Sequence, residues 1–256
     1  MNELAIDIGN TDLVLGFWPN QSKDPHTQRL KVKKIVENKS ILNSFLNASL
    51  SEFGIKNITS ITLCSVVPIL TPIVSVEVKK ICSTELVILD KENYHYLPIG
   101  ILKPNEIGTD LVANALAAHI FYKTSSIIID FGTAMSFTTI DENGKIIGVA
   151  IAPGLQTAIK TLTHNAAQLF DVPIVQPNSA LGLDTKHAIQ AGITFGYDGM
   201  VRGIINAQEK EIGKKLNVIF TGGLSKIVHS LKDRVDHYQP YLTLEGIRLA
   251  GNFITR

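Results

Sequence analysis

The sequence has few of the features that mark a secreted, membrane-spanning or nucleic-acid-binding protein. Only two cysteines, Cys64 and Cys82, occur in 256 residues. Both lie in apolar stretches, so we expect buried thiols and neither a disulfide framework nor a metal site. No run reaches the ~18 consecutive apolar residues of a membrane span, and the opening MNELAIDIGN does not resemble a signal peptide. The net charge of +1 offers no broad basic surface for nucleic acid. We therefore expect a cytoplasmic protein without a membrane or nucleic-acid partner.

Common catalytic signatures are also missing. The seven histidines show no metal-ligand spacing, and there is no Ser/His/Asp triad motif or Cys-x-x-Cys. The composition itself, 45% hydrophobic and 18% charged, is typical of a globular chain. A chain of this length can bury a sizeable core, in one large domain or in two closely packed ones.

One motif occurs twice, about half a chain apart. LAIDIGNT (residues 4–11) and IIIDFGTA (residues 127–134) are both apolar strands that end in Asp-x-Gly, and each is followed by a second apolar strand. Asp7 and Asp130 are 130 − 7 = 123 positions apart. Repetition at this spacing indicates two copies of one architecture.

Strand and helix patterns alternate after the opening hairpin of each copy, which predicts an α/β fold. We expect a helix that Ser40 caps and Gly54 ends, since these residue types favour those positions. Further helices are expected at 71–81, 109–122, 156–170 and 185–212, the last of them continuous or broken, and buried strands at 58–67, 85–89 and 218–220. Glycines at three- and four-residue steps in the last helix predict close packing against another element of this chain or of a partner subunit: Gly192, Gly196, Gly199 and Gly203.

The repeated turn is suited to binding phosphate. A strand that ends in Asp and turns at once through Gly exposes backbone N–H groups that form an anion-binding concavity. Asp7 and Asp130 then lie where a cation could bridge protein and phosphate. A single Asp-x-Gly is most often an ordinary hairpin turn, but two copies favour a phosphate site. The turn at Thr221-Gly222-Gly223, which we expect to follow a strand and to precede a helix, offers a third place where a nucleotide could lie against backbone.

Asp110 is the candidate for accepting a proton from an alcohol. The segment PNEIGTD (residues 104–110) leads an extended stretch into a helix. Asp110 falls in its first turn, where the helix dipole favours an anion. Phosphoryl transfer to a hydroxyl uses a carboxylate of this kind. From local sequence alone, a residue that merely complements the dipole is an equally good interpretation.

Taken in order, these motifs resemble those of the type III pantothenate kinases, members of the acetate-and-sugar-kinase/heat-shock-chaperone/actin superfamily. The resemblance runs from Asp7 to about Asn252. It is carried by six segments: residues 7–11, 105–110, 130–134, 148–155, 184–192 and 221–223. It implies duplicated ribonuclease H-like domains (the actin-like ATPase fold), with halves at 1–103 and 104–256 and the active-site cleft between them.

The resemblance further implies that ATP phosphorylates pantothenate to 4'-phosphopantothenate, the first step of coenzyme A biosynthesis, with Mg²⁺ and in a homodimer whose active site lies near the interface. Asp110 resembles the catalytic proton acceptor, and Asp130 the ligand of a monovalent cation, K⁺ or NH₄⁺. The positions that resemble ATP contacts are Asp7, Ile8, Gly9, Asn10, Thr11, Asp12, Leu13, Val14, Thr133, Gly222 and Gly223. Those that resemble pantothenate contacts are Gly108, Thr109, Asp110, Leu111 and, across the dimer interface, Thr185.

Two positions depart from the family pattern. Leu111 stands where the family usually has Arg, and Ile101 where it usually has Tyr; both positions help to hold pantothenate. Losing a charged hydrogen-bonding partner typically costs about 1.5–3 kcal/mol. Two alternatives therefore stay open: a kinase of the same fold that acts on another small hydroxy acid or sugar, with Leu111 and Ile101 marking an apolar pocket, and a catalytically weak relative with a regulatory or binding role.

Overall fold

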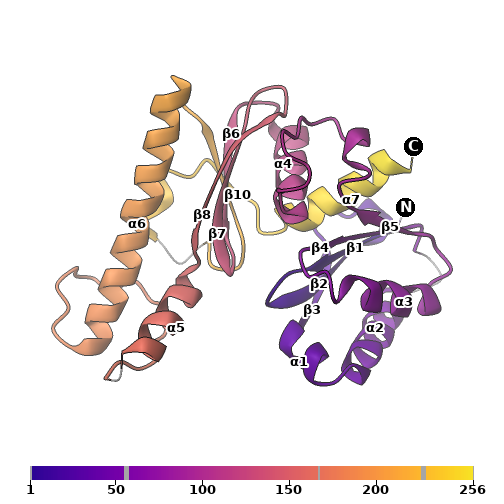
Figure 1. Cartoon of the computed structure of the whole chain (residues 1–256), viewed down its shortest axis with the longest axis horizontal. Coiled ribbons are helices and arrows are strands. Elements are labelled where there is room, and N and C mark those ends of the chain that lie inside the picture. The colour runs from indigo at the N-terminus through magenta and orange to yellow at the C-terminus, as the bar shows by residue number, and fades with distance from the viewer. Residues whose placement is uncertain (1, 55–57, 167, 226–228, 256) are drawn as a thin grey trace. The chain divides into compact units, whose positions relative to one another are not determined.

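The chain folds into two compact units (Figure 1). The computed structural model describes residues 2–54, 58–166, 168–225 and 229–255. Unit 1 comprises residues 1–122 and 241–256, and unit 2 comprises residues 123–240. This division differs from the boundary expected after residue 103, because the helices at 109–122 and 242–254 both pack on the first sheet.

Unit 1 is built on a five-stranded sheet. Its strands are β1 (Glu3–Ile8), β2 (Asp12–Trp18), β3 (His26–Lys31), β4 (Ser60–Ser65) and β5 (Leu86–Leu89). Its helices are α1 (Val32–Glu37), α2 (Ser40–Phe53), α3 (Thr71–Ile81), α4 (Thr109–Tyr122) and α7 (Leu242–Ile254), with 3₁₀ turns η1 (Pro19–Gln21) and η3 (Tyr94–Tyr96). The strand order is β3-β2-β1-β4-β5. The first three strands are antiparallel, whereas β4 and β5 run parallel to β1.

Unit 2 repeats this topology. Its strands are β6 (Ser126–Phe131), β7 (Ala134–Ile140), β8 (Ile146–Pro153), β9 (Asn217–Thr221) and β10 (His237–Tyr238). Its helices are α5 (Leu155–Asn165) and α6 (Thr185–Ile212), with the 3₁₀ turn η4 (His229–Asp233). In the order β8-β7-β6-β9-β10, each strand matches one of unit 1 in position and direction. The predicted α/β fold and its internal duplication are confirmed.

The alternation of side chains along β1 determines which of them face the apolar core and which face the opposite side of the sheet. Leu4, Ile6 and Ile8 are buried in the core shared with α2 and α3. Because successive residues of a strand point to opposite faces, Ala5 and Asp7 lie on the other face. Helices α4 and α7 cover that face. Asp7 therefore shares a face of the sheet with the first turn of α4.

Helix α7 packs unusually close to its neighbours. A Cβ added at Gly246 would collide with the backbone of Ala113 on α4, and one at Gly251 would collide with Thr62 on β4. Arg248 holds the helix by charge, because its guanidinium lies 2.7 Å from Glu3 Oε2 on β1 and over the ring of Trp18 at 5.3 Å. These contacts bind α7 to unit 1 although unit 2 separates the two in sequence.

In unit 2 the same alternation leaves Asp130 out of the core. Ile127, Ile129 and Phe131 on β6 pack into a cluster that also contains Leu155 of α5 and Val201 of α6. Figure 1 shows α5 and α6 beside this sheet. Asp130 thus occupies the same strand position in unit 2 as Asp7 does in unit 1. Each aspartate faces away from the apolar cluster of its own unit.

Most predicted elements are present, with corrections at their ends. Helices α3, α4 and α6 have the expected bounds, and α6 is continuous. Gly54 ends α2 in the left-handed conformation (φ 78°), as predicted. The predicted cap at Ser40 is wrong: Lys39 precedes the helix, and Ser40 N–H and Oγ instead donate to Asn38 Oδ1.

Two further expectations need correction. Helix α5 ends at Asn165, short of the expected residue 170, and the next backbone N–H, that of Ala166, closes its last turn on Leu162 O. Within the described residues, no other element packs closely on the glycines of α6. A Cβ added at any of the four would meet no atom of the described structure within 4 Å. Among the described helices, none combines the length and the apolar character needed to cross a membrane.

Candidate active site

The first Asp-x-Gly turn is closed by backbone hydrogen bonds. Gly9 N–H donates to Asp12 O at 3.0 Å, and Thr11 O accepts from Val32 N–H, where β3 passes into α1, at 2.9 Å. The carboxylate of Asp12 is bound by cations of β3, since Lys31 Nζ lies 3.0 Å from Oδ1 and Arg29 from Oδ2 at 3.2 Å. The turn is therefore held in shape before any ligand binds.

Asp7 lies beside the end of β4 and the beginning of α4. In the parallel pair of β1 and β4, Asp7 is opposite Cys64. The Thr109 hydroxyl donates to Ser65 O at 3.0 Å, which ties the start of α4 to the end of β4. Burial raises the pKa of the Cys64 thiol well above its usual value, and the charges of Asp7 and Asp110 raise it further. Two predicted site acids thus lie near one buried, neutral sulfur.

Asp110 occupies the first turn of α4, as predicted. Leu111 N–H donates to its Oδ1 at 2.9 Å. A Cβ on Gly108 would overlap the same oxygen, so glycine is needed there for the carboxylate to fold back over the helix start. Burial raises the pKa of Asp110, and this outweighs the backbone N–H donors, which lower it. A carboxylate with a raised pKa is a better proton acceptor than an ordinary surface aspartate.

The second Asp-x-Gly turn is held by the start of α5. Thr133 O accepts from Gly154 N–H at 3.0 Å and from the Thr157 hydroxyl at 2.7 Å. Gly154 carries no Cβ because the carbonyl oxygens of Gly132 and Thr133 occupy that space. The segment after β8 therefore closes directly over the turn.

The Thr-Gly-Gly turn meets Asp130. In the parallel pair of β6 and β9, Asp130 lies opposite Thr221. Gly222 follows with φ +88°, and a Cβ there would lie 2.5 Å from Asp130 Oδ1 and 2.7 Å from Phe131 N. The helix expected after this turn falls partly on residues 226–228, which lie outside the described residues. Unit 2 thus brings Gly222 of the Thr-Gly-Gly turn against Asp130 of the second Asp-x-Gly motif.

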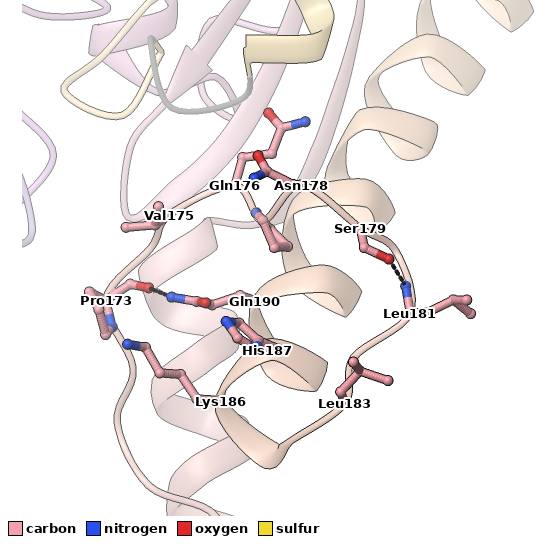
Figure 2. Close-up of a pocket in the computed structure, with 11 residues that line it drawn as sticks. Pro173, Val175, Gln176, Asn178, Ser179, Leu181, Leu183, Lys186, His187 and Gln190 are labelled. Carbon is pink, nitrogen blue, oxygen red and sulfur yellow. Dashed lines mark hydrogen bonds between the residues drawn. The ribbon is translucent and has the colours of Figure 1, made fainter.

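Thr185 lies apart from these groups, at the start of α6. Asp184 caps the helix and accepts from His187 N–H at 2.8 Å. A pocket of about 590 Å³ adjoins this end of α6, lined by side chains of Lys186, His187 and Gln190 and by the segment 173–183. Figure 2 shows Gln190 hydrogen-bonded to Pro173 across it. The structure does not group Thr185 with the turn residues of unit 2.

Four of the candidate binding residues have buried side chains. Ile8 and Leu13 are fully buried, Val14 is 8% exposed and Leu111 is 7% exposed. Side chains in the core cannot reach a ligand without unfolding, so these positions can contribute only through their backbone. For Leu111, the backbone N–H donates to Asp110 Oδ1 and so helps to orient this carboxylate.

Sequence reasoning overlooked several residues that build the site. Cys64 was recognised only as a buried thiol, and its place beside Asp7 depends on the strand order β1-β4. Thr157 lies on the expected helix, but nothing local indicates that its hydroxyl binds Thr133 O. Within the described residues, no cluster of three or more His, Cys, Asp or Glu could hold a metal ion by itself. A cation held by one or two carboxylates and by phosphate oxygens fits such a donor set.

Comparison with known structures supports the fold. A putative 2-dehydro-3-deoxygalactonokinase from Sinorhizobium meliloti is similar over 98% of this chain and 96% of its own, with a TM-score of 0.60 at 13% identity. The ethanolamine utilization protein EutJ from Carboxydothermus hydrogenoformans covers 99% of this chain and 90% of its own, with a TM-score of 0.55 at 14% identity. The chain therefore has the actin-like ATPase fold.

Comparison of sequences identifies the family. A model described as type III pantothenate kinase matches residues 3–207. A type III pantothenate kinase of Treponema pallidum is 37% identical over 251 residues, which are 95% of this chain and 91% of that protein. The protein of the same name from Moorella thermoacetica is 34% identical over 246 residues, 96% of this chain and 97% of its own. This chain belongs to the type III pantothenate kinase family and is an ATP-dependent kinase.

Proposed function

We propose that the protein transfers the terminal phosphoryl group of ATP to pantothenate, with Asp110 as the residue that accepts the proton of the attacking hydroxyl. The observation that carries this assignment is geometric: Asp7 lies opposite Cys64 in the β1–β4 pair, and Thr109, the neighbour of Asp110, is hydrogen-bonded to the next residue of β4, Ser65. The phosphate motif and the acceptor motif thereby share one end of the sheet. The raised pKa of Asp110 supports its role, because a stronger base accepts a proton more readily.

Nucleotide phosphates bind, in this proposal, at the Asp-x-Gly turns, beside Asn10–Thr11 and Gly132–Thr133, and at the turn Gly222–Gly223. The closed geometry of both Asp-x-Gly turns supports this role, because preformed donors need no rearrangement when the anion arrives. Mg²⁺, which neutralises developing phosphate charge, accompanies the nucleotide. Asp7, on the strand that leads into the first turn, is proposed to orient the water ligands of this ion.

Asp130 is proposed to bind the activating monovalent cation, K⁺ or NH₄⁺. Its fit to this role rests on Gly222, which leaves the space beside Asp130 Oδ1 free of a side chain. K⁺ should raise the melting temperature of the protein relative to Na⁺ at equal ionic strength, and Asp130→Asn should remove this difference. An equal K⁺ effect in the variant would place the cation elsewhere.

The decisive experiment compares acceptors. Purified protein is given ATP, Mg²⁺ and K⁺ with pantothenate or with a panel of small hydroxy acids and sugars. We expect turnover with pantothenate and a loss of roughly 10²–10⁴-fold in kcat for Asp110→Asn. Glu106→Gln, a change of an exposed acid in the same segment, is the matched control and should keep wild-type kcat. Turnover with another acceptor alone would reject pantothenate as the substrate.

We also propose that the protein is a homodimer through α6, and that it acts in the cytoplasm. The exposed glycines of α6 support the interface, because helices without side chains at the contact can approach closely. Phe195, 36% exposed, lies one turn from Gly192 and Gly199 on the same helix face. In such a dimer, Thr185 of one protomer contacts pantothenate bound by the other.

The dimer can be tested with one bulky substitution. Gly199→Trp should convert the dimer to a folded monomer by light scattering, because indole blocks a close helix contact while the loss of glycine favours the helix itself. Val36→Trp, at a 66% exposed site on α1 of unit 1, controls for added surface hydrophobicity. A monomeric wild-type protein, or a Gly199→Trp protein that stays dimeric, would reject this interface.

A further inference from the structure

Tyr197 connects the middle of α6 to the end of β8. Its side chain is 8% exposed, and its ring packs in the apolar cluster that contains Phe131 of β6 and Leu155 of α5. The Tyr197 hydroxyl donates to Pro153 O at 2.6 Å. Because burial raises the pKa of Tyr197 above its usual value, the hydroxyl keeps its proton at neutral pH and remains a donor. The hydrogen bond therefore joins the helix and the strand throughout the neutral pH range.

Pro153 lies directly beside the second Asp-x-Gly turn. It is the last residue of β8 and is opposite Ala134, the first residue of β7. In the described sheet, β8 is an edge strand and pairs only with β7. Proline also has no N–H to donate. The Tyr197 hydroxyl thus anchors a strand end that the sheet holds from one side only.

The residues after Pro153 close on the turn without free space. Gly154 N–H donates to Thr133 O at 3.0 Å, and the Thr157 hydroxyl donates to the same oxygen at 2.7 Å. The carbonyl oxygens of Gly132 and Thr133 occupy the place that a Cβ on Gly154 would take. Close-packed groups transmit a shift because no void absorbs it. A movement of the end of β8 would therefore move the backbone of the turn.

We propose that Tyr197 is a positioning residue for the nucleotide, because its hydrogen bond to Pro153 keeps the second Asp-x-Gly turn in the shape that receives phosphate. This inference rests on the proposed function, which takes this turn as part of the ATP site. Tyr197 lies in the apolar cluster of unit 2, whereas Asp130 faces away from that cluster. Tyr197 therefore acts through the backbone of β8 and Gly154 and not by touching the phosphates. The effect is confined to the nucleotide, since the acceptor is proposed to bind beside Asp110 in unit 1.

The test removes only the hydroxyl and keeps the ring in the cluster. Tyr197→Phe should weaken the binding of a non-hydrolysable ATP analogue with Mg²⁺ by roughly three- to tenfold, which corresponds to the usual net worth of one hydrogen bond. Isothermal titration calorimetry measures this affinity without turnover. In steady-state kinetics, the KM for ATP should rise by the same factor, while the KM for pantothenate should keep its wild-type value. An unchanged affinity for the analogue would overturn the inference.

Thr194→Val is the matched control. Thr194 is 1% exposed, and its hydroxyl donates to Gln190 O at 2.8 Å within α6. The variant therefore loses a buried hydrogen bond of the same kind, from a hydroxyl to a backbone carbonyl, on the same helix. Both variants should have a melting temperature a few degrees lower, and only Tyr197→Phe should bind the analogue more weakly. Equal weakening in both would show that a general loss of stability is the cause, and would contradict a positioning role.

A third variant separates the inference from the proposed function. Gly132→Ala changes the turn itself, since a Cβ there would lie 3.2 Å from Ala134 O and 3.6 Å from Asp130 Oδ1. It should weaken the binding of the analogue at least as much as Tyr197→Phe does. Wild-type affinity in Gly132→Ala would remove the turn from the ATP site, and the inference would fall with that proposal. A loss in Gly132→Ala without one in Tyr197→Phe would reject only the role of Tyr197.

Discussion

The two Asp-x-Gly turns share a framework and differ in what reinforces it. In each, the carbonyl of a threonine accepts from a backbone N–H at the end of the third strand: Thr11 from Val32, and Thr133 from Gly154. The first turn leaves four residues, 9–12, between the paired Ile8 and Leu13. The second leaves three, 132–134, between Phe131 and Met135. Duplication has thus preserved the hydrogen bond that shapes the turn and not the turn length.

The reinforcing contacts are chemically different. Unit 1 uses charge, because Asp12 pairs with Arg29 and Lys31, both of which are 58% exposed in their side chains. Unit 2 uses a neutral hydrogen bond from Thr157, together with Gly222 packed on Asp130. Exposed ion pairs are weak and sensitive to salt, whereas packed backbone contacts are neither. We therefore expect the second turn to be the more rigid of the two.

The largest effect is expected from Gly222→Ala. Alanine is strained at φ +88°, and its Cβ would lie 2.5 Å from Asp130 Oδ1. We expect a loss of about 1–3 kcal/mol in the free energy of unfolding, measured with urea, and at least a tenfold higher KM for ATP. Gly223→Ala is the control, because a Cβ there would meet no atom of the described residues within 4 Å. Equal losses in both variants would contradict the tight packing ascribed to the second turn.

The second-largest effect is expected at Asp110, the acid at the start of α4 in unit 1. Its buried carboxylate lowers the free energy of unfolding at neutral pH. Its pKa is raised in the folded protein, so the folded state holds the proton more tightly than the unfolded one, and stability falls as pH rises through that raised value. Asp110→Asn should therefore raise the melting temperature by a few degrees at neutral pH.

The gain from Asp110→Asn should shrink towards zero below the ordinary aspartate pKa of about 3.9. Scanning calorimetry from pH 3 to pH 8 checks this, with Asp24→Asn at an exposed site as the control. A pH-independent difference would show that burial of the charge is not the cause.

A smaller effect is expected from Thr157→Val. Valine keeps the shape of threonine but cannot donate to Thr133 O, so the free energy of unfolding should fall by about 1 kcal/mol. Thr161→Val, at an exposed position of the same helix, should have less effect. If the two variants behave alike, Thr157 does not reinforce the turn.

The smallest effect is expected from Asp12→Asn. Because the cationic partners of Asp12 are 58% exposed, losing these ion pairs should cost between 0 and about 1 kcal/mol, and high salt should abolish the difference because it screens the charges. Urea unfolding at low and at high NaCl measures both quantities. A cost that persists at high salt would show that the two turns are reinforced in more similar ways than the ion pairs suggest.

Local signals in the sequence predicted much of this fold. The bounds of α3 and α4 agree with those expected from the sequence, and Gly54 ends α2 in the left-handed conformation that glycine favours. The duplication was visible because Asp7 and Asp130 each end a strand at a turn. The cap at Ser40 failed because Asn38 takes its hydrogen bonds.

What could not be predicted depends on contacts between distant segments. The position of Cys64 beside Asp7 follows from the order of the strands in the sheet. The burial of Leu111 on α4 was not predicted either. A helix that is covered on several sides has no single apolar stripe, so its sequence does not show which residues face the core. The glycines of α6 predicted close packing, and the described part of this chain provides no element that packs there.

The return of α7 to unit 1 has a consequence for protein synthesis. Domains generally fold as units while the chain emerges, starting from the N-terminus. Here residues 123–240 leave the ribosome before α7, whose glycines fit against Ala113 and Thr62. Unit 2 can therefore complete its folding while the nascent unit 1 still lacks one of the helices that cover its sheet. Unit 1, whose first 122 residues are translated first, thus completes its folding last.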